Sequence, residues 1–177
     1  MKWRNSSTRY GLMAVFLHWL AVLLLIALIY TGLVMADMPR GPEKLTLIDL
    51  HGAVGQTLAV LMIIRYLWKG LTRQPQPFPD QGTRLNFLKN LIHQGFYFIV
   101  WIQVAAGILA LFTVGRALDY FGWFQIISPM ARDIPAHHFW EDVHLYSWYF
   151  LITMVAFHIA AVFYHQVRGH RVIQRML

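Results

Sequence analysis

Four long apolar segments dominate the sequence, and they restrict the fold more than any other feature. Residues 11–36, 91–115 and 143–167 contain no Lys, Arg, Asp or Glu, and residues 47–67 contain only Asp49 and Arg65, near their two ends. An apolar stretch of about 20 residues is long enough to cross a bilayer as a helix. We therefore predict an all-α integral membrane protein whose four transmembrane helices form one bundle.

The composition agrees with a membrane protein and excludes several kinds of chemistry. Only 13% of the residues are charged, against about 25% in a typical soluble domain. The chain contains no cysteine, which excludes disulfides, iron–sulfur clusters and thiolate metal sites. The connecting segments are too short for separate domains. We predict one transmembrane domain over residues 1–177, with helices near 11–36, 47–69, 88–115 and 140–168.

The charged residues are distributed unevenly between the two ends of the predicted bundle. With the N-terminus inside, the basic residues of the inner side are Lys2, Arg4, Arg9, Arg65, Lys69, Arg73, Arg84, Lys89, Arg168, Arg171 and Arg175. The outer side has only Arg40, Lys44, Arg116 and Arg132, whereas every acidic residue except Asp80 falls there. The positive-inside rule then predicts that both termini are cytoplasmic. The basic excess indicates anionic lipid as a partner, and nucleic acid is not needed to explain it.

Histidines inside the apolar segments are the candidate functional residues. His144 and His158 are 14 residues apart, which is almost four helical turns, so both imidazoles leave one helix face roughly 21 Å apart along the axis. His18 lies near the inner end of its segment and His51 near the outer end of its own. By depth, His158 therefore pairs with His18 on the inner side. His144 pairs with His51 on the outer side.

Two facing histidines at each depth predict a haem at each depth. Two axial imidazoles make a six-coordinate b-type haem suited to electron transfer, and bundle interiors commonly hold such cofactors. A single histidine in a span often only bonds to a neighbouring helix, and two histidines without a carboxylate are few ligands for zinc or copper. Ionisable residues in spans are costly and usually functional. We therefore predict two haem b groups whose iron is bound by these four histidines.

For other polar residues the sequence leaves two or more roles open. Arg65 is 14 residues after His51, which brings it to the inner level, where it either pairs with a haem propionate or anchors the helix at the inner surface. His93 is a spare ligand, a hydrogen-bond partner of a propionate or a quinone, or a packing residue. His137 and His138 fall in an outer loop, where a solvated surface is expected and a pH-dependent or quinone contact is the alternative.

Several motifs together resemble the prokaryotic cytochrome b561 family of four-helix, di-haem membrane proteins. These motifs are RYG and FLHWL around His18, DLHGAVG around His51, IIRYLWK around Arg65, LIHQGFY around His93, FGWF at 121–124, and the spacing H-x13-H-x6-H that begins at His144. The gap of 33 residues between His18 and His51 also matches. The resemblance covers nearly the whole chain.

The resemblance implies a function as well as a fold. It implies two b haems, one on His18 and His158 and one on His51 and His144, and electron exchange with ubiquinone in the bacterial inner membrane. It implies an oxidoreductase with a periplasmic donor, which is superoxide in at least one member. The alternative is a di-haem anchor subunit that carries electrons for a separate dehydrogenase or a periplasmic partner. A histidine-containing transporter is a third hypothesis, and no side chain is predicted to be an acid–base catalyst.

Overall fold

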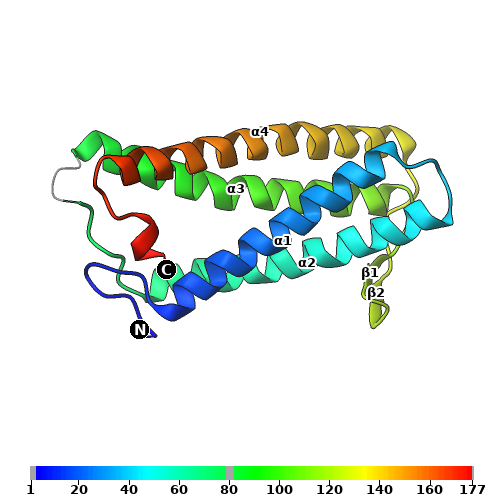
Figure 1. Ribbon diagram of the computed structural model, residues 1–177. Coiled ribbons are helices and arrows are strands. Elements are labelled where there is room, and N and C mark those ends of the chain that lie inside the picture. The colour runs from blue at the N-terminus through cyan, green and yellow to red at the C-terminus, as the bar shows by residue number, and fades with distance from the viewer. Residues whose placement is uncertain (1–2, 79–81, 177) are drawn as a thin grey trace.

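The computed structural model describes residues 3–78 and 82–176, so Lys2 and Asp80 of the charge pattern lie outside the described residues. Its four long helices are α1 (Leu12–Asp37), α2 (Pro42–Leu71), α3 (Thr83–Thr113) and α4 (Ile134–Val167). Each helix is long and apolar enough to cross a membrane. The predicted fold class, an all-α membrane bundle of four helices, is therefore confirmed (Figure 1). Both ends of the described chain lie at the same end of the bundle.

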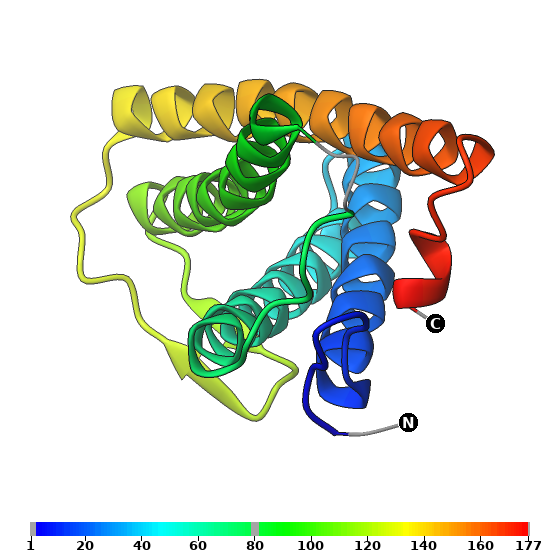
Figure 2. The same cartoon turned by 90° about the vertical axis from the view of Figure 1, so that its left-hand side faces the viewer.

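The helices pack as two antiparallel hairpins. α1 lies against α2, α3 lies against α4, and the two hairpins meet mainly where α2 contacts α3. Within the described chain, neither α1 nor α2 packs closely against α4. Figure 2 shows this pairing from the end of the bundle at which the termini lie. The central core is built from three of the helices and consists of Leu58, Met62, Ile99, Val100 and Leu151.

Three helices extend beyond the bounds predicted from hydropathy. α2 begins at Pro42 rather than near 47, because proline suits a first turn, in which the N–H has no partner within the helix. α4 begins at Ile134 rather than near 140, because the Asp133 carboxylate accepts a hydrogen bond of 3.0 Å from the Ala136 N–H and caps the helix. α3 likewise begins at Thr83 rather than near 88. Hydropathy located the apolar part of each helix and missed its polar turns.

A short hairpin replaces part of the loop expected between α3 and α4. Its strands β1 (Leu118–Tyr120) and β2 (Phe124–Ile126) are antiparallel. Phe121 and Gly122 have φ values of 51° and 73°, so the tight turn uses the left-handed region that glycine adopts readily. The Gln56 side-chain amide donates to the Asp119 carbonyl at 2.9 Å. The hairpin is therefore held against the outer half of α2.

Hydrogen bonds tie the two terminal segments to the end of the bundle that the charge pattern predicts to be the inner one. The Asn5 side-chain amide donates to the Arg73 carbonyl at 3.0 Å, beyond the end of α2. The Trp19 indole N–H of α1 donates to the Met176 carbonyl at 3.0 Å, just after a short 3-10 helix, η1 (Ile173–Arg175). Both terminal segments therefore lie at the inner ends of α1 and α2.

Candidate functional site

At the outer level, the structure brings the rings of His51 of α2 and His144 of α4 close together in an edge-on arrangement. Their ring centroids are 6.2 Å apart and the ring planes meet at 72°. Two imidazoles that bind one metal ion from opposite sides, each through a bond of about 2 Å, have ring centres about 6 Å apart. The separation of this pair therefore suits an iron between them, although the two residues are 93 positions apart in the sequence.

Thr31 of α1 sets the orientation of the His51 ring. The Thr31 hydroxyl donates to the Ala27 carbonyl at 2.8 Å, so its oxygen accepts from the His51 Nδ1, 2.9 Å away. Nε2 of His51 then keeps a lone pair. Metal-binding histidines usually donate the other ring N–H to a protein acceptor in this way. The Nδ1 bond therefore orients the His51 ring so that Nε2 is available to bind a metal.

α3 holds His144 in the same manner. The His144 Nδ1 donates to the Gln103 carbonyl at 2.9 Å, and its Nε2 lies 3.2 Å from the Gln103 side-chain nitrogen, which donates to it. The Ser147 hydroxyl donates in turn to the Gln103 side-chain oxygen. A metal bound at Nε2 would replace the hydrogen bond from the Gln103 amide and leave the backbone bond at Nδ1 in place.

A glycine makes room for His144 at the outer level. A Cβ added to Gly107 would lie 3.2 Å from Cε1 of His144, which is tighter than ordinary contact, whereas one added to Gly32 would lie 3.6 Å from Cε1 of His51, an ordinary contact distance. Sequence reasoning missed Gly107, Thr31 and Gln103. The available signal was that Thr31 and Gln103 are isolated polar residues inside uncharged segments, with Gly107 one turn beyond Gln103.

At the inner level, three histidines gather instead of two. The rings of His93 on α3 and His158 on α4 have centroids 5.8 Å apart. His18 on α1 lies within electrostatic range of both, and of Arg65 on α2. Nδ1 of His93 donates to the Lys89 carbonyl at 2.7 Å. The site residues predicted for this level therefore lie in one region, and His93 belongs to it.

Arg65 and Trp68 present donors without acceptors at this level. Within the described chain, the Arg65 Nη1 and the Trp68 Nε1 are buried and have no hydrogen-bond partner. Leaving a buried donor unpaired costs about 1–3 kcal/mol, and more for a charged group. Tyr10, before α1, lies close enough to feel the Arg65 charge, and burial raises the pKa of its hydroxyl above 10.0. The region therefore offers a cation and neutral donors to an acceptor such as a carboxylate.

A packed apolar layer separates the two levels. Leu151 of α4 is seven residues from both His144 and His158, and it is 2% exposed. Leu58 of α2, at 3% exposed, lies seven residues after His51 and seven before Arg65. Because each helix carries its layer residue midway between the two levels, each level is a distinct site rather than part of one cavity.

His137 and His138 do not lie in a loop as predicted. They occupy the first turns of α4, because Asp133 caps the helix several residues earlier than hydropathy indicated. The His137 side chain is 20% exposed and the His138 side chain 69%. These two residues are therefore held at the outer end of the helix that carries His144.

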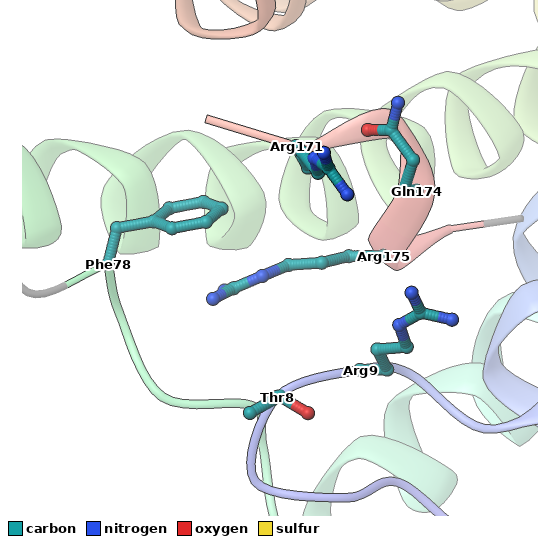
Figure 3. Close-up of a pocket in the computed structure, with 6 residues that line it drawn as sticks. All are labelled: Thr8, Arg9, Phe78, Arg171, Gln174 and Arg175. Atoms are coloured by element: carbon teal, nitrogen blue, oxygen red, sulfur yellow. The ribbon is translucent and has the colours of Figure 1, made fainter. Parts of the chain in front are cut away.

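A surface pocket at the inner end joins three segments that are distant in sequence (Figure 3). It has a volume of about 200 Å³, and its lining residues are Thr8, Arg9, Phe78, Arg171, Gln174 and Arg175. The Arg175 guanidinium carbon lies 3.6 Å from the centre of the Phe78 ring. The lining includes three arginines and no acidic residue. The pocket therefore favours an anion.

The residues of the outer level fit a haem. The outer pair has the ring separation that axial ligation needs, and both Nδ1 atoms are bonded to protein acceptors, which leaves Nε2 as the ligand atom. The inner level adds unpaired buried donors that suit propionates. A fold of four helices that can span a membrane, with histidines at two levels, is consistent with a four-helix membrane cytochrome b.

The comparisons with known proteins give the family. The family model described as prokaryotic cytochrome b561 matches residues 9–177, and this chain belongs to that family. It is 23% identical over 185 residues to a protein called "Cytochrome b561 homolog 2" from Escherichia coli (strain K12), an alignment that covers 100% of this chain and 95% of the relative. The family indicates a multi-pass bacterial membrane protein that binds haem b and transfers electrons, as the motifs predicted.

Proposed function

We propose that this protein is a di-haem membrane oxidoreductase that moves single electrons between a periplasmic donor and ubiquinone in the bacterial inner membrane. The outer pair of histidines carries the proposal, because both rings have Nδ1 bonded to the protein and are 6.2 Å apart. His51 and His144 would bind the outer haem, and His18 and His158 the inner haem. A bound haem supplies a reversible one-electron couple of its iron.

The helix packing favours His18 over His93 as the partner of His158. Helices in direct contact have axes about 8–10 Å apart, which leaves little room for a porphyrin between their histidines. α3, which carries His93, packs directly on α4, whereas α1, which carries His18, does not. The outer pair follows the same rule, because α2 and α4 are not packed closely either. His93 is then a neighbour that fixes the His158 ring.

The remaining residues of the inner site would bind the edge of the cofactor. Arg65 offers a charged donor and Trp68 a neutral one, both buried and both without an acceptor in the described chain. Charge-assisted bonds from arginine to carboxylates are among the strongest hydrogen bonds in proteins. We expect these two side chains to hold a propionate group and to keep the inner haem in one orientation.

The absorption spectrum of the purified, haem-supplied protein tests the cofactor assignment. We expect a reduced b-type band from two haems per chain. His144→Ala and His18→Ala should each remove about half of the bound haem and spare the other half, with expression and helix content unchanged. A protein without the b-type band would refute the proposal and favour a transporter. A His93→Ala variant with the same loss as His18→Ala would instead assign His93 as a ligand.

The orientation of the chain is proposed with both termini in the cytoplasm. The pocket with three arginines lies at the end of the bundle where the termini meet, and basic pockets on that side of a membrane suit anionic lipid headgroups. Because the chain has no cysteine, single cysteines can report the topology. In intact spheroplasts, an impermeant maleimide should label Ser128→Cys and should not label Ser6→Cys. The reverse labelling would refute this orientation.

Superoxide is the donor that we propose first. An anionic donor needs a cationic approach, and one of the four outer basic residues, Arg116, is paired with Asp49 at 2.6 Å. The Lys44 ammonium donates to the neutral Met38 carbonyl at 3.1 Å and keeps its charge. Lys44, Arg40 and Arg132 therefore supply the positive charge for steering. The purified protein should reduce ubiquinone with superoxide alone, and Arg132→Gln should slow that reaction more at low salt than at high salt.

The exposed tip of the hairpin favours a second candidate function. Trp123 is 83% exposed and Ile127 is 81% exposed, and both lie beside or in the hairpin between α3 and α4. Exposed aromatic and aliphatic groups of this kind mark either a membrane interface or a protein contact. The alternative function is therefore a di-haem anchor subunit for a dehydrogenase or a periplasmic partner. Activity that appears only with a co-purified partner would favour it over the enzyme.

A further inference from the structure

Three potential metal ligands gather at the outer end of α4, apart from the haem site. The His137 Nε2 is 3.2 Å from one carboxylate oxygen of Glu141, and the His138 Nδ1 is 3.3 Å from the same oxygen. The ligand atoms of the three residues all lie within 4.8 Å of one another. Residues three and four positions apart share a helix face, so α4 itself creates this cluster.

The backbone of α3 determines which nitrogen of His137 faces the cluster with a lone pair. The His137 Nδ1 is 2.9 Å from the Ala110 carbonyl, which can only accept, so this nitrogen carries the proton. Nε2 of the neutral ring is then an acceptor, and it faces a carboxylate oxygen at 3.2 Å. Two acceptors this close need a cation between them, either a proton on the ring or a shared metal ion. The N–H to carbonyl bond is also the outer-shell support that metal-binding histidines commonly have.

The spacing matches the coordination shell of a small transition metal. Ligands bound tetrahedrally at about 2.0–2.1 Å are about 3.3 Å from one another. Two of the three separations already have this value, at 3.2 and 3.3 Å, and the third is no more than 4.8 Å. Imidazoles with one carboxylate suit zinc, copper or nickel rather than calcium or magnesium.

We propose that His137, His138 and Glu141 form a binding site for a divalent transition-metal ion of the Zn²⁺ type. Two imidazoles and one carboxylate supply three ligands, and water completes the shell because the side chains of His138 and Glu141 are 69% and 54% exposed. Metal binding itself does not depend on the haem assignment, since none of the three residues is a proposed haem ligand.

The effect of the site on the outer haem rests on the proposed function, in which His144 binds that haem. His144 is seven residues further along α4 than His137, about 10 Å along the helix axis. A bound dication therefore adds positive charge close to the outer haem level. It also fixes the turn of α4 that His137 attaches to α3. Positive charge near a haem favours its reduced form, so with a haem on His51 and His144 metal binding would raise the reduction potential of that haem relative to the inner one.

Equilibrium dialysis of the purified full-length holoprotein against Zn²⁺, without an affinity tag and after removal of metal with a chelator, tests the site. We expect one ion per chain with a dissociation constant in the micromolar range or below. Glu141→Gln and His138→Gln should each weaken binding at least tenfold. Asp142→Asn is the matched control, because it removes a negative charge that is also exposed, one residue away, and should leave the affinity unchanged.

A second pair of histidines could also bind Zn²⁺, so the experiment must distinguish it from the proposed site. The rings of His165 and His170 are close at the inner end, with 3.3 Å between their Nδ1 atoms. His165→Gln should leave Zn²⁺ binding intact if the site is where we place it, and zinc-edge X-ray absorption should show two imidazoles. Loss of binding in His165→Gln, no binding by the wild type, or equal weakening by Asp142→Asn and Glu141→Gln would each overturn the proposal.

Discussion

The histidines of the outer and inner levels differ in how many hydrogen bonds orient their rings. At the outer level, His51 and His144 are each bonded through Nδ1 to an acceptor on a neighbouring helix. At the inner level, neither ring nitrogen of His18 or His158 has a hydrogen bond within the described chain, and the Arg65 Nη1 is buried without a partner. The outer site is organised by protein contacts. The inner site needs a ligand to satisfy its polar groups.

This difference implies that the two levels respond differently to the same kind of change. Loss of an orienting bond at the outer level disturbs a ligand that the protein already holds in place. At the inner level, loss of an unpaired donor should stabilise the haem-free protein, because a buried donor without a partner is destabilising. In the haem-bound protein, the same change removes a hydrogen bond to the proposed propionate. Four variants, from the largest expected effect to the smallest, test this comparison.

Gly107→Leu should have the largest effect. Even a Cβ at this position would lie 3.2 Å from Cε1 of His144, so a leucine side chain must displace the imidazole. We expect loss of about half of the haem, and redox titration should show that the outer centre is missing. Gly70→Leu is the matched control, because nothing lies within 4 Å of its Cβ position. Normal haem content in Gly107→Leu would show that His144 is not a ligand.

Thr31→Val should weaken the outer site without removing a ligand. The substitution deletes the hydroxyl that accepts from the Nδ1 of His51 and keeps the shape of the side chain. Removing such an outer-shell partner typically costs 10–100-fold in affinity, so we expect this range for the outer haem, measured by haem transfer to an acceptor protein. Thr153→Val is the control, since its hydroxyl is exposed and bonds only within α4. Equal haem retention in the two variants would contradict the comparison.

Arg65→Leu should stabilise the haem-free protein and destabilise the haem-bound protein. Without haem, the variant removes a buried unpaired donor and should raise the unfolding free energy by about 1–3 kcal/mol. With haem, it should weaken binding of the inner haem about tenfold, because a charged partner of a propionate is lost. Thermal unfolding with and without haem measures both effects. Arg65→Lys should retain most of the haem binding, and destabilisation of both forms by Arg65→Leu would contradict the proposed role.

Gln103→Leu should have the smallest effect. The backbone carbonyl that orients His144 stays, while the side-chain contacts with the His144 Nε2 and with Ser147 are lost. We expect normal haem content, because iron would displace the amide from Nε2, and a loss of about 1 kcal/mol in stability. Ser147→Ala provides a comparison, because it removes only the hydrogen bond from the Ser147 hydroxyl to the Gln103 side chain. A loss of the outer haem in Gln103→Leu would show that the side chain, rather than the backbone, positions His144.

The sequence alone determined the four membrane helices and the two depths of the site. Hydropathy is a local property, so each apolar segment by itself predicts a transmembrane helix. The 14-residue spacing of His144 and His158 fixes two levels, because both residues lie on one rigid helix. Helix ends were predicted less well, because the capping by Asp133 and the first turn at Pro42 lie in polar sequence.

The tertiary structure decided which groups face one another. Nothing local to Thr31 or Gln103 indicates that they bond to His51 and His144, since the partners are 20 and 41 positions away. The same holds for the ring contact of His93 with His158 and for the carbonyl of Ala110 that orients His137. These contacts depend on how each helix is rotated and tilted against its neighbours. The rotation and tilt of each helix are set by packing across the whole bundle, so they cannot be predicted from one segment alone.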